Sequence, residues 1–302
     1  MADLTILIPL DGTKAAELPL SLVGALKGLG SVRVRLLSVA ETSDDESPDE
    51  EKEKVKAVTD YLDDAGSRVE ARYGFGVECI CRTGKPDVEI IEEAARPDVN
   101  LILMTTHGKT SAEPEHLGAV ADRVVRGASC ATLLVGPHAS VPLEIGAITV
   151  PLDGSRLAAE ALPVARAFAQ RLGSRLRLIR ALTQKSVDEE QAGSLVADVI
   201  GSTELTAPLY LEEAKLELET AAPVETAVLD GPAAEAILHD LKVNRPDLVI
   251  MTSHGRRGFV RWAVGSVTDR VIRGPVPVLV VRPAAEVGQR LGALLTRQEW
   301  SG

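Results

Sequence analysis

The feature that most constrains this chain is a phrase that it contains twice: His-Gly, nine residues and another glycine. The first copy spans residues 107–118 and the second spans residues 254–265. An apolar run of strand length precedes each copy, at residues 101–104 and 248–251. A glycine loop between a buried strand and a helix start exposes backbone N–H groups that can bind phosphate. The two copies therefore indicate a duplicated nucleotide-binding unit.

The repeat extends over nearly the whole chain. Leu4–Gly12 and Ala147–Gly154 are apolar runs that end in Pro-Leu-Asp-Gly, and the hydroxyl residue after each, Thr13 or Ser155, is a typical helix N-cap. Strands alternate with helical stretches in each copy, which predicts a parallel sheet covered on both faces. Further strands are expected at Val32–Val39 and Leu176–Ala181, before Gly84 and Gly231, at 101–104 and 248–251, and at Thr132–Val135 and Val278–Val281.

The acidic stretch Asp44–Glu51 predicts the start of a helix. Ser47 suits the N-cap, Pro48 the first helical position and Glu50 the third position of a capping box. The residues of this helix that share an apolar face are Val55, Val58, Leu62 and Ala65.

The sequence thus predicts an α/β fold of two tandem doubly wound domains, each an open five-stranded parallel sheet with helices on both faces. The first domain is expected over residues 1–140 and the second over residues 146–285, with a C-terminal tail at 286–302. The polar, proline-containing stretch from Pro137 to Gly146 separates the copies. About 140 to 150 residues is an ordinary domain size.

Composition excludes several classes of protein. A formal net charge of −11 argues against a general nucleic-acid binder, which needs a basic face. No apolar run has transmembrane length, and the N-terminus lacks a signal-peptide pattern, so a cytoplasmic protein is expected. Three cysteines form no disulfide framework. Cys79 and Cys81 alternate along a strand and face one side, which favours reduced packing and leaves a redox pair as the alternative.

The expected ligand site lies where the strand order reverses, beyond the carboxyl ends of the first and fourth strands. If these strands are neighbours, each Pro-Leu-Asp-Gly turn shares a crevice with a His-Gly loop. Asp11 and Asp153 would contact a nucleoside there, or would cap the next helix. Neither GxxxxGK[ST] nor a GxGxxG after the first strand occurs, so the chain is neither a P-loop NTPase nor a dinucleotide-binding Rossmann domain.

These residues resemble the universal stress protein family, in its tandem two-domain form, over both copies. The ATP-binding pattern of that family is Gly-x2-Gly-x9-Gly-[Ser/Thr]. The second copy matches it at Gly255, Gly265 and Ser266 and departs at the first glycine, where it has Thr252. The first copy shares this departure at its own threonine and also lacks the final hydroxyl. The resemblance implies an adenine-nucleotide α-hydrolase-like fold.

The resemblance also implies the residues that bind the nucleotide. Met104 and Met251 could alternatively serve only as core residues, and Gly84 and Gly231 could be pocket wall or plain turn glycines. The favoured set, in the second domain, is Pro151, Asp153, Ala181, Met251, Thr252, His254, Gly255, Arg256, Gly265, Ser266, Val267 and Thr268. The weaker set, in the first domain, is Pro9, Asp11, Val39, Met104, Thr105, Gly108, Gly118, Ala119 and Val120.

The charges of the two loops differ. The nine residues of the second loop contain Arg256, Arg257 and Arg261 and no acid, whereas those of the first contain Lys109 against two glutamates, Glu113 and Glu115. Residues 1–142 have a net charge of −9 and residues 143–302 one of −2. Because arginine pairs with phosphate oxygens and like charges repel them, the second domain is predicted to hold ATP more tightly. The first is expected to bind weakly, to be empty, or to take a less charged ligand.

The function expected from the resemblance is binding of ATP (or ADP or AMP), with Mg²⁺ carried by the phosphates, as a regulatory ligand in a stress response. Catalysis beyond slow hydrolysis is not expected, and His107 and His254 more plausibly hold their loops than act as bases. The two domains would form an intramolecular pseudo-dimer through their fifth strands; a homodimer and an unidentified protein partner are further expectations. A nucleotide-independent interaction module and a genuine ATP-hydrolysing enzyme are the alternatives.

Overall fold

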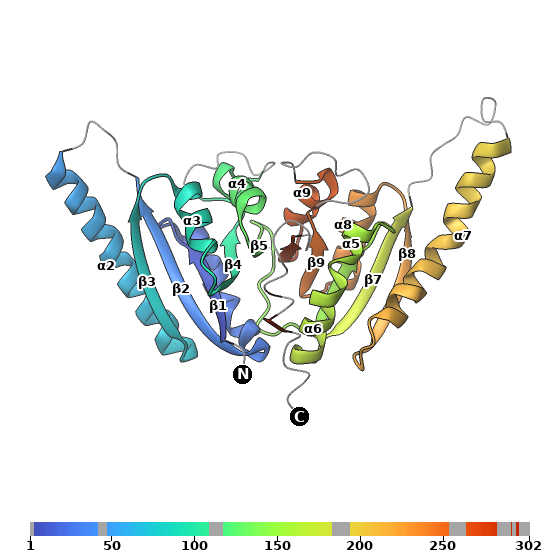
Figure 1. Ribbon diagram of the computed structural model, residues 1–302, viewed down its shortest axis with the longest axis horizontal. Helices are drawn as coiled ribbons and strands as arrows, with labels where there is room; N and C mark the ends of the chain where they lie inside the picture. Colours follow the sequence, from blue (N-terminus) through green and yellow to red (C-terminus); the bar gives the residue numbers. More distant parts are fainter. Residues whose placement is uncertain are drawn as a thin grey trace.

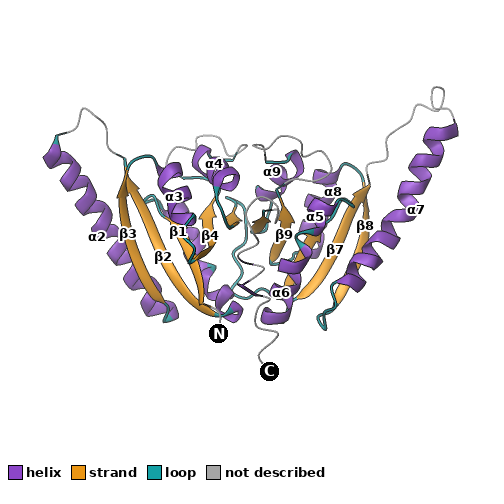
Figure 2. Cartoon of the chain, in the orientation of Figure 1, coloured by secondary structure: helices purple, strands orange, loops and turns teal. Residues whose placement is uncertain are grey.

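Strands and helices alternate along the chain as the sequence pattern predicts (Figure 1). The computed structural model describes residues 3–41, 47–108, 117–182, 194–253, 264–282, 291 and 294–295, with the backbone alone at 194–205. Figure 2 shows the strands as one curved layer with helices on both of its faces.

The first domain begins with a strand that ends at the first Pro-Leu-Asp-Gly turn. Its elements, in which η marks a 3₁₀ helix, are β1 (Asp3–Pro9), α1 (Lys14–Glu17), η1 (Leu18–Ser21), η2 (Val23–Leu29), β2 (Ser31–Ala40), α2 (Pro48–Tyr73), β3 (Gly76–Thr83), α3 (Pro86–Ala94), β4 (Val99–Thr105), α4 (Ala119–Gly127) and β5 (Ala131–Val135).

The second domain repeats this order after the linker. Its elements are β6 (Ala147–Pro151), α5 (Arg156–Ala159), α6 (Leu162–Leu172), β7 (Arg175–Leu182), α7 (Ser194–Glu217), β8 (Val224–Asp230), α8 (Ala233–Asn244), β9 (Leu248–Thr252), α9 (Ser266–Ile272) and β10 (Val278–Val281). The strands expected from the sequence are present in both halves, and most extend a residue or two beyond the predicted bounds.

The strands form a single ten-stranded sheet in the order β3-β2-β1-β4-β5-β10-β9-β6-β7-β8. Pairing is parallel within each half, as predicted, and antiparallel only between β5 and β10 among the strand pairs of the described chain. Leu133 lies opposite Leu279 in that pair. The resemblance implied contact through the fifth strands; the pairing goes further, because it joins two five-stranded sheets into one.

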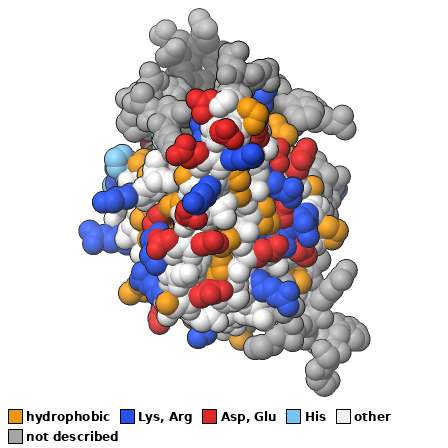
Figure 3. All heavy atoms as spheres, turned by 90° about the vertical axis from the view of Figure 1, so that its left-hand side faces the viewer, with side chains coloured by type: hydrophobic (Ala, Val, Ile, Leu, Met, Phe, Trp, Pro, Cys, Tyr) orange, Lys and Arg blue, Asp and Glu red, His pale blue; other side chains and the backbone are white. Residues whose placement is uncertain are grey.

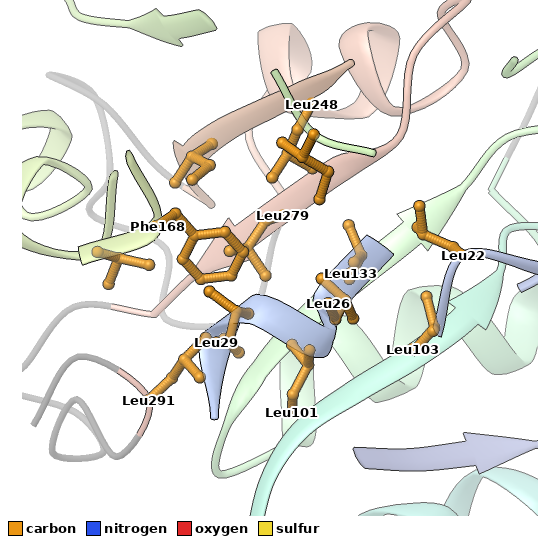
Figure 4. Close-up of a cluster of buried hydrophobic side chains, with 14 of the residues drawn as sticks. Leu22, Leu26, Leu29, Leu101, Leu103, Leu133, Phe168, Leu248, Leu279 and Leu291 are labelled. Carbon is orange, nitrogen blue, oxygen red and sulfur yellow. The ribbon is translucent and has the colours of Figure 1, made fainter. Parts of the chain in front are cut away.

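The two faces of the sheet carry separate cores, and both cores cross the junction. On the face covered by η2, α2, α6 and α7, Leu26 and Leu29 join Leu133, Phe168 and Leu279 in one buried cluster (Figure 4). The opposite face packs against α3, α4, α8 and α9. Burying apolar side chains from both halves together stabilises the junction as well as each domain.

The segment after β1 departs from the helix that its Ala/Leu-rich pattern predicts. Thr13 is the N-cap, and its side chain accepts a hydrogen bond from the backbone N–H of Ala16, but the α-helix lasts one turn before two 3₁₀ helices replace it. A Cβ at Gly24 would lie 2.7 Å from the Tyr73 ring, and one at Gly28 would lie 2.8 Å from the Leu172 side chain. These close approaches fix the path of the segment, so tertiary contact overrides local helix propensity.

Helix α2 matches its predicted start. Ser47 and Glu50 form both hydrogen bonds of the capping box, and Gly74 ends the helix in a left-handed conformation with φ of 69°. Leu62 and Ala65 are buried against the sheet.

The outer face of this half of the molecule mixes acidic and basic side chains (Figure 3). No helix in the described ranges is both long and apolar enough to cross a membrane.

A buried arginine fastens α3 to the sheet. Arg35 of β2 forms ion pairs with Glu78, Glu93 and Asp98 at 2.7–3.1 Å, and the Glu93 side chain on α3 is 1% exposed. In the second domain, Arg177 of β7 pairs in the same way with Asp240 of α8, at 2.9 Å. The charges of both arginines are thus compensated by carboxylates where they leave water.

The junction between the domains is not symmetric in its side chains. The registers of β4–β5 and β9–β10 place Gly136 and Arg282 at equivalent positions, one residue after β5 and β10. The Arg282 guanidinium donates to the carbonyls of Val125, Arg126 and Ala128, at the C-terminal end of α4. A cation there also interacts favourably with the helix dipole.

We expect Arg282→Ala to lower the free energy of unfolding by about 1–2 kcal/mol, because the last carbonyls of α4 lose a charged donor. Gly136→Ala should also destabilise, by about 1–3 kcal/mol, since its Cβ would lie 2.8 Å from the Ile272 carbonyl oxygen. Lys52→Ala, in an exposed ion pair, is the control, with a change within about 0.5 kcal/mol. Urea unfolding measures all three, and an Arg282→Ala value equal to the control would contradict the capping role.

Candidate functional site

The carboxyl ends of the first and fourth strands meet in both domains. β1 lies between β2 and β4, and β6 lies between β7 and β9. The strand order therefore reverses between β1 and β4 and again between β6 and β9, which is where an open α/β sheet binds its ligands. The predicted crevice requires the first and fourth strands of each domain to be neighbours, and they are neighbours in both halves.

A pocket of about 370 Å³ occupies this place in the first domain, a size within the range of small-molecule sites. It lies over the ends of β1, β2 and β4 and against the start of α4. The structure brings together there all nine residues that the sequence assigned to this domain: Pro9, Asp11, Val39, Met104, Thr105, Gly108, Gly118, Ala119 and Val120.

The Asp11 carboxylate sits at the turn after β1, where Gly12 takes a left-handed φ of 83°. Its Oδ1 accepts hydrogen bonds from the backbone N–H and the hydroxyl of Thr13, at 2.9 and 2.6 Å. A Cβ at Gly108 would lie under 3.0 Å from Oδ2. The helix N-cap is Thr13 itself, so Asp11 supports the turn with one oxygen and faces the His-Gly loop with the other.

Hydrogen bonds within the loop after β4 shape the floor of the pocket. The Thr105 hydroxyl donates to the His107 carbonyl at 2.9 Å, and the Thr106 hydroxyl lies 2.7 Å from Nδ1 of His107. The Gly118 N–H donates to the Thr106 carbonyl at 2.9 Å. Thr105, where the family pattern has glycine, thus closes the loop, and the His107 ring contacts the hydroxyl of the residue before it.

The start of α4 suits a negatively charged or strongly polar group. Gly118 is its N-cap and provides no capping side chain for the first N–H groups of the helix, and Gly118, Ala119 and Val120 line the pocket. The absence of a side chain at Gly108 leaves room for the Asp11 carboxylate beside this backbone. Met104 both lines the pocket and packs in the core, at 6% exposure.

Sequence reasoning missed several charged residues of this pocket. Lys85 and Asp87 come from the turn and first helical turn after β3, Glu41 follows β2, and Arg123 lies on α4. The signal was Gly84, whose φ of 135° marks the turn that carries the first two into the pocket wall. The other lining residues that were not predicted are Leu10, Ala16, Leu37, Pro86, Ile90, Thr106, His107 and Ala121.

The second domain repeats this frame in the part that is described. The Asp153 carboxylate accepts from the Ser155 N–H at 2.9 Å, and the Gly265 N–H donates to the Ser253 carbonyl at 2.9 Å. The buried Thr268 hydroxyl donates to the Thr252 carbonyl. Pro151 and Met251 are buried, Ala181 and Val267 are half-buried, and Ser266 is exposed at the start of α9. His254, Gly255 and Arg256, with Arg257 and Arg261, lie outside the described residues.

The strand cysteines face one helix, as their alternation predicts. Cys79 lies 3.3 Å from the Leu62 carbonyl oxygen and Cys81 lies 3.9 Å from that of Val55, both on α2. Both are free thiols. Burial raises the pKa of the Cys79 thiol, which disfavours the reactive thiolate. Cys79 is nevertheless exposed and Cys81 half-buried, so these contacts place both thiols against α2 without burying them.

No group of three or more His, Cys, Asp or Glu that could hold a metal ion occurs in the described ranges.

Comparison with known proteins identifies the family. The family described as universal stress protein matches residues 4–136 and 144–282. A universal stress protein of Methanocaldococcus jannaschii is 31% identical over 144 residues, 45% of this chain and 81% of its own length. One of Thermus aquaticus is 32% identical over 149 residues, 45% of this chain and 97% of its own length.

A solved structure shows the same fold over both domains. The crystal structure of a universal stress protein from Archaeoglobus fulgidus is similar with a TM-score of 0.70 and 22% identity, over 92% of this chain and 98% of that one. The internal repeat, the strand order and the two segments matched by the family all divide the chain into the same two units. The chain belongs to the universal stress protein family, with one family unit in each of its two tandem domains.

Proposed function

We propose that the second domain binds an adenine nucleotide, preferentially ATP, as a regulatory ligand in a stress response. The observation that carries the proposal is the convergence of the nine sequence-assigned residues of the first domain on one pocket at the strand-order reversal. The second domain has the same backbone frame and side chains better suited to phosphate. The proposal extends to ADP and AMP, with Mg²⁺ carried by the phosphates.

The shared frame is visible in the backbone angles of the glycines. Gly12 and Gly154 both have φ of 83°. Gly118 has φ and ψ of −57° and 145°, and Gly265 has −61° and 144°. A pocket geometry set by turns and strand ends is therefore available to both domains, and the sequence differences decide which ligand each one takes.

Those differences favour ATP in the second domain. Ser266 offers a hydroxyl where the first domain has Ala119, and the loop contributes arginines without a glutamate. Phosphate oxygens accept charge-assisted hydrogen bonds from arginine, whereas nearby carboxylates repel them.

The proposed roles follow from these contacts. Asp153 would accept hydrogen bonds from the sugar or base, and Ser266 with the start of α9 would donate to phosphate. Bound Mg²⁺ would neutralise phosphate charge. Hydrolysis would be slow at most, because the Asp153 carboxylate already supports its own turn.

We also propose that the units 1–140 and 146–285 act as an intramolecular pseudo-dimer joined at β5 and β10, with 286–302 as a tail. Nucleotide occupancy would be read out through a protein partner or through assembly of the whole chain into a homodimer. Partner binding and homodimer assembly are each distinct from nucleotide binding.

Binding is tested first on the purified protein. Heat denaturation followed by chromatography of the supernatant should release an adenine nucleotide, and Mg-ATP should raise the melting temperature of nucleotide-free protein. If no nucleotide is released and Mg-ATP causes no thermal shift, the proposal is overturned and a nucleotide-independent interaction module is favoured. Rapid release of ADP or AMP from added ATP would instead indicate an ATP-hydrolysing enzyme.

Paired variants test which domain holds ATP. Gly265→Asp should weaken ATP binding in calorimetry by at least about tenfold, because a carboxylate enters the phosphate end. The matched Gly118→Asp should leave that affinity unchanged. Ser266→Ala should weaken ATP by about three- to tenfold, the worth of one hydrogen bond. The reverse result, with Gly118→Asp abolishing binding and Gly265→Asp tolerated, would contradict the assignment.

A further inference from the structure

The C-terminal segment of the chain returns to the junction between the two domains. Leu291, Leu294 and Leu295 lie beyond β10, the last strand of the second domain, and each has helical backbone. Their spacing of three and four residues places the side chains on one face of a helix. Leu291 and Leu295 are only 2% and 3% exposed and belong to the buried cluster that contains Leu29 and Phe168 (Figure 4). We call the segment that carries these three leucines the strap.

The strap contacts the first domain as well as the second. Leu294 lines a cavity of about 900 Å³ whose other described lining residues all belong to the first domain, within residues 5–100. Lys27 and Gly30 at the end of η2 are among them, as are Ser31 and Gly76 at the starts of β2 and β3. A segment that follows the last strand of the second domain therefore lies against the first domain, at the opposite end of the sheet from the ligand pocket.

Arg171 joins three parts of the chain at this place. It lies in the last turn of α6, and its guanidinium donates to the Leu29 carbonyl at 3.0 Å and to the Leu295 carbonyl at 2.7 and 3.2 Å. One side chain of the second domain thus bonds both the end of η2 and the strap. Hydrogen bonds from a charged donor are about twice as strong as those between neutral groups, so this contact is the main polar attachment among the described residues of the strap.

The corresponding position of the first domain has no side chain to make such a contact. Residues 28–30 (Gly-Leu-Gly) end η2 where residues 171–173 (Arg-Leu-Gly) end α6. A Cβ at Gly28 would lie 2.8 Å from the Leu172 side chain and 3.3 Å from the Arg171 carbonyl oxygen. The two helix ends therefore meet in close contact, which the bare backbone of one copy allows, while the arginine of the other copy binds the strap.

We infer that the junction surface formed by Leu29, Phe168 and Arg171 is a docking site for an amphipathic helical segment, and that the chain's own C-terminal segment occupies it as a releasable strap. The described residues of the strap contribute no strand to the sheet, so β5 and β10 remain paired without it. Leucines at positions i, i+3 and i+4 are the anchors with which an amphipathic helix binds an apolar surface.

The short connection favours docking within one chain over exchange between two copies. Only residues 282–290 separate β10 from the first leucine of the strap. A short link raises the effective concentration of the strap at its site far above that of a free segment. Three leucines and one arginine nevertheless form a small set of contacts, so the strap can detach while both domains stay folded. Detachment would expose the apolar surface to another segment with the same leucine spacing.

Limited proteolysis of the full chain measures how often the strap leaves its site. Trypsin cleaves after Arg290, and this bond adjoins the buried Leu291, so cleavage requires detachment. We expect Arg171→Met to speed this cleavage by about tenfold, because the charged hydrogen bonds are lost while the aliphatic packing is kept. Arg68→Met, which removes an ion-paired arginine from α2, is the matched control and should change the rate by less than about twofold. Equal rates in the two variants would overturn the inference.

The dependence of this rate on protein concentration separates a strap bound within one chain from a strap exchanged between two copies. We expect the rate constant for cleavage after Arg290 to stay the same over a hundredfold range of concentration. Cleavage that slows as the concentration rises would place the strap on a second copy and overturn the intramolecular assignment.

A labelled peptide of residues 286–302 tests the docking site itself. The double substitution Leu291→Asp and Leu295→Asp in the full chain places two carboxylates in the apolar cluster, so the strap should detach and leave the site open. We expect the peptide to bind this variant at least tenfold more tightly than the natural chain, as measured by fluorescence anisotropy. The control is Leu209→Asp with Leu216→Asp, at two leucines of α7 that are 70% and 76% exposed, and it should not open the site.

The outcomes of the peptide experiment either support or overturn the inference. Tighter binding to the double-aspartate variant, weakened again by adding Arg171→Met, would support it. Equal binding to both chains, or no binding to a variant whose circular dichroism spectrum matches that of the natural chain, would overturn it. A double-aspartate variant that does not fold would also overturn it, because the strap would then be an essential part of the core.

Discussion

The antiparallel pairing of β5 with β10 is the interaction on which the rest of the molecule depends. Each five-stranded parallel unit has an unpaired edge at its fifth strand, and such edges are prone to non-specific association. Pairing them covers both edges and places Leu133 opposite Leu279. The apolar side chains of both halves then merge into cores on each face of the sheet, so that neither domain completes its core alone.

This junction also breaks the symmetry of the duplication. Arg282 reaches from the second domain to the C-terminal carbonyls of α4, whose first residues line the pocket of the first domain. At the equivalent position, Gly136 lies against the carbonyls that end α9 and has no side chain to bond them. One domain is therefore held by the other at the helix that borders its ligand site, and the reciprocal contact is made by backbone alone.

The sequence predicted those features of the fold that depend on residues close together in the chain, such as helix caps and turns. The Ser47–Glu50 capping box and the Pro-Leu-Asp-Gly turns form as expected, and parallel strand order follows from alternation of strands and helices. Contacts between distant segments could not be predicted in this way. The 3₁₀ segment after β1 depends on Tyr73 and on Leu172 of the other domain, and Lys85 and Asp87 reach the pocket only through the fold of β3 and α3.

The duplication separates two kinds of constraint on a ligand site. A position whose backbone geometry is demanding is the same in both copies: Gly12 and Gly154 share a left-handed φ that other residues rarely adopt. Positions that only set charge, such as Asp87 and Ala234, differ. A frame fixed by the backbone can keep its shape while the side chains of its wall change, so selectivity for the ligand can change without cost to the fold.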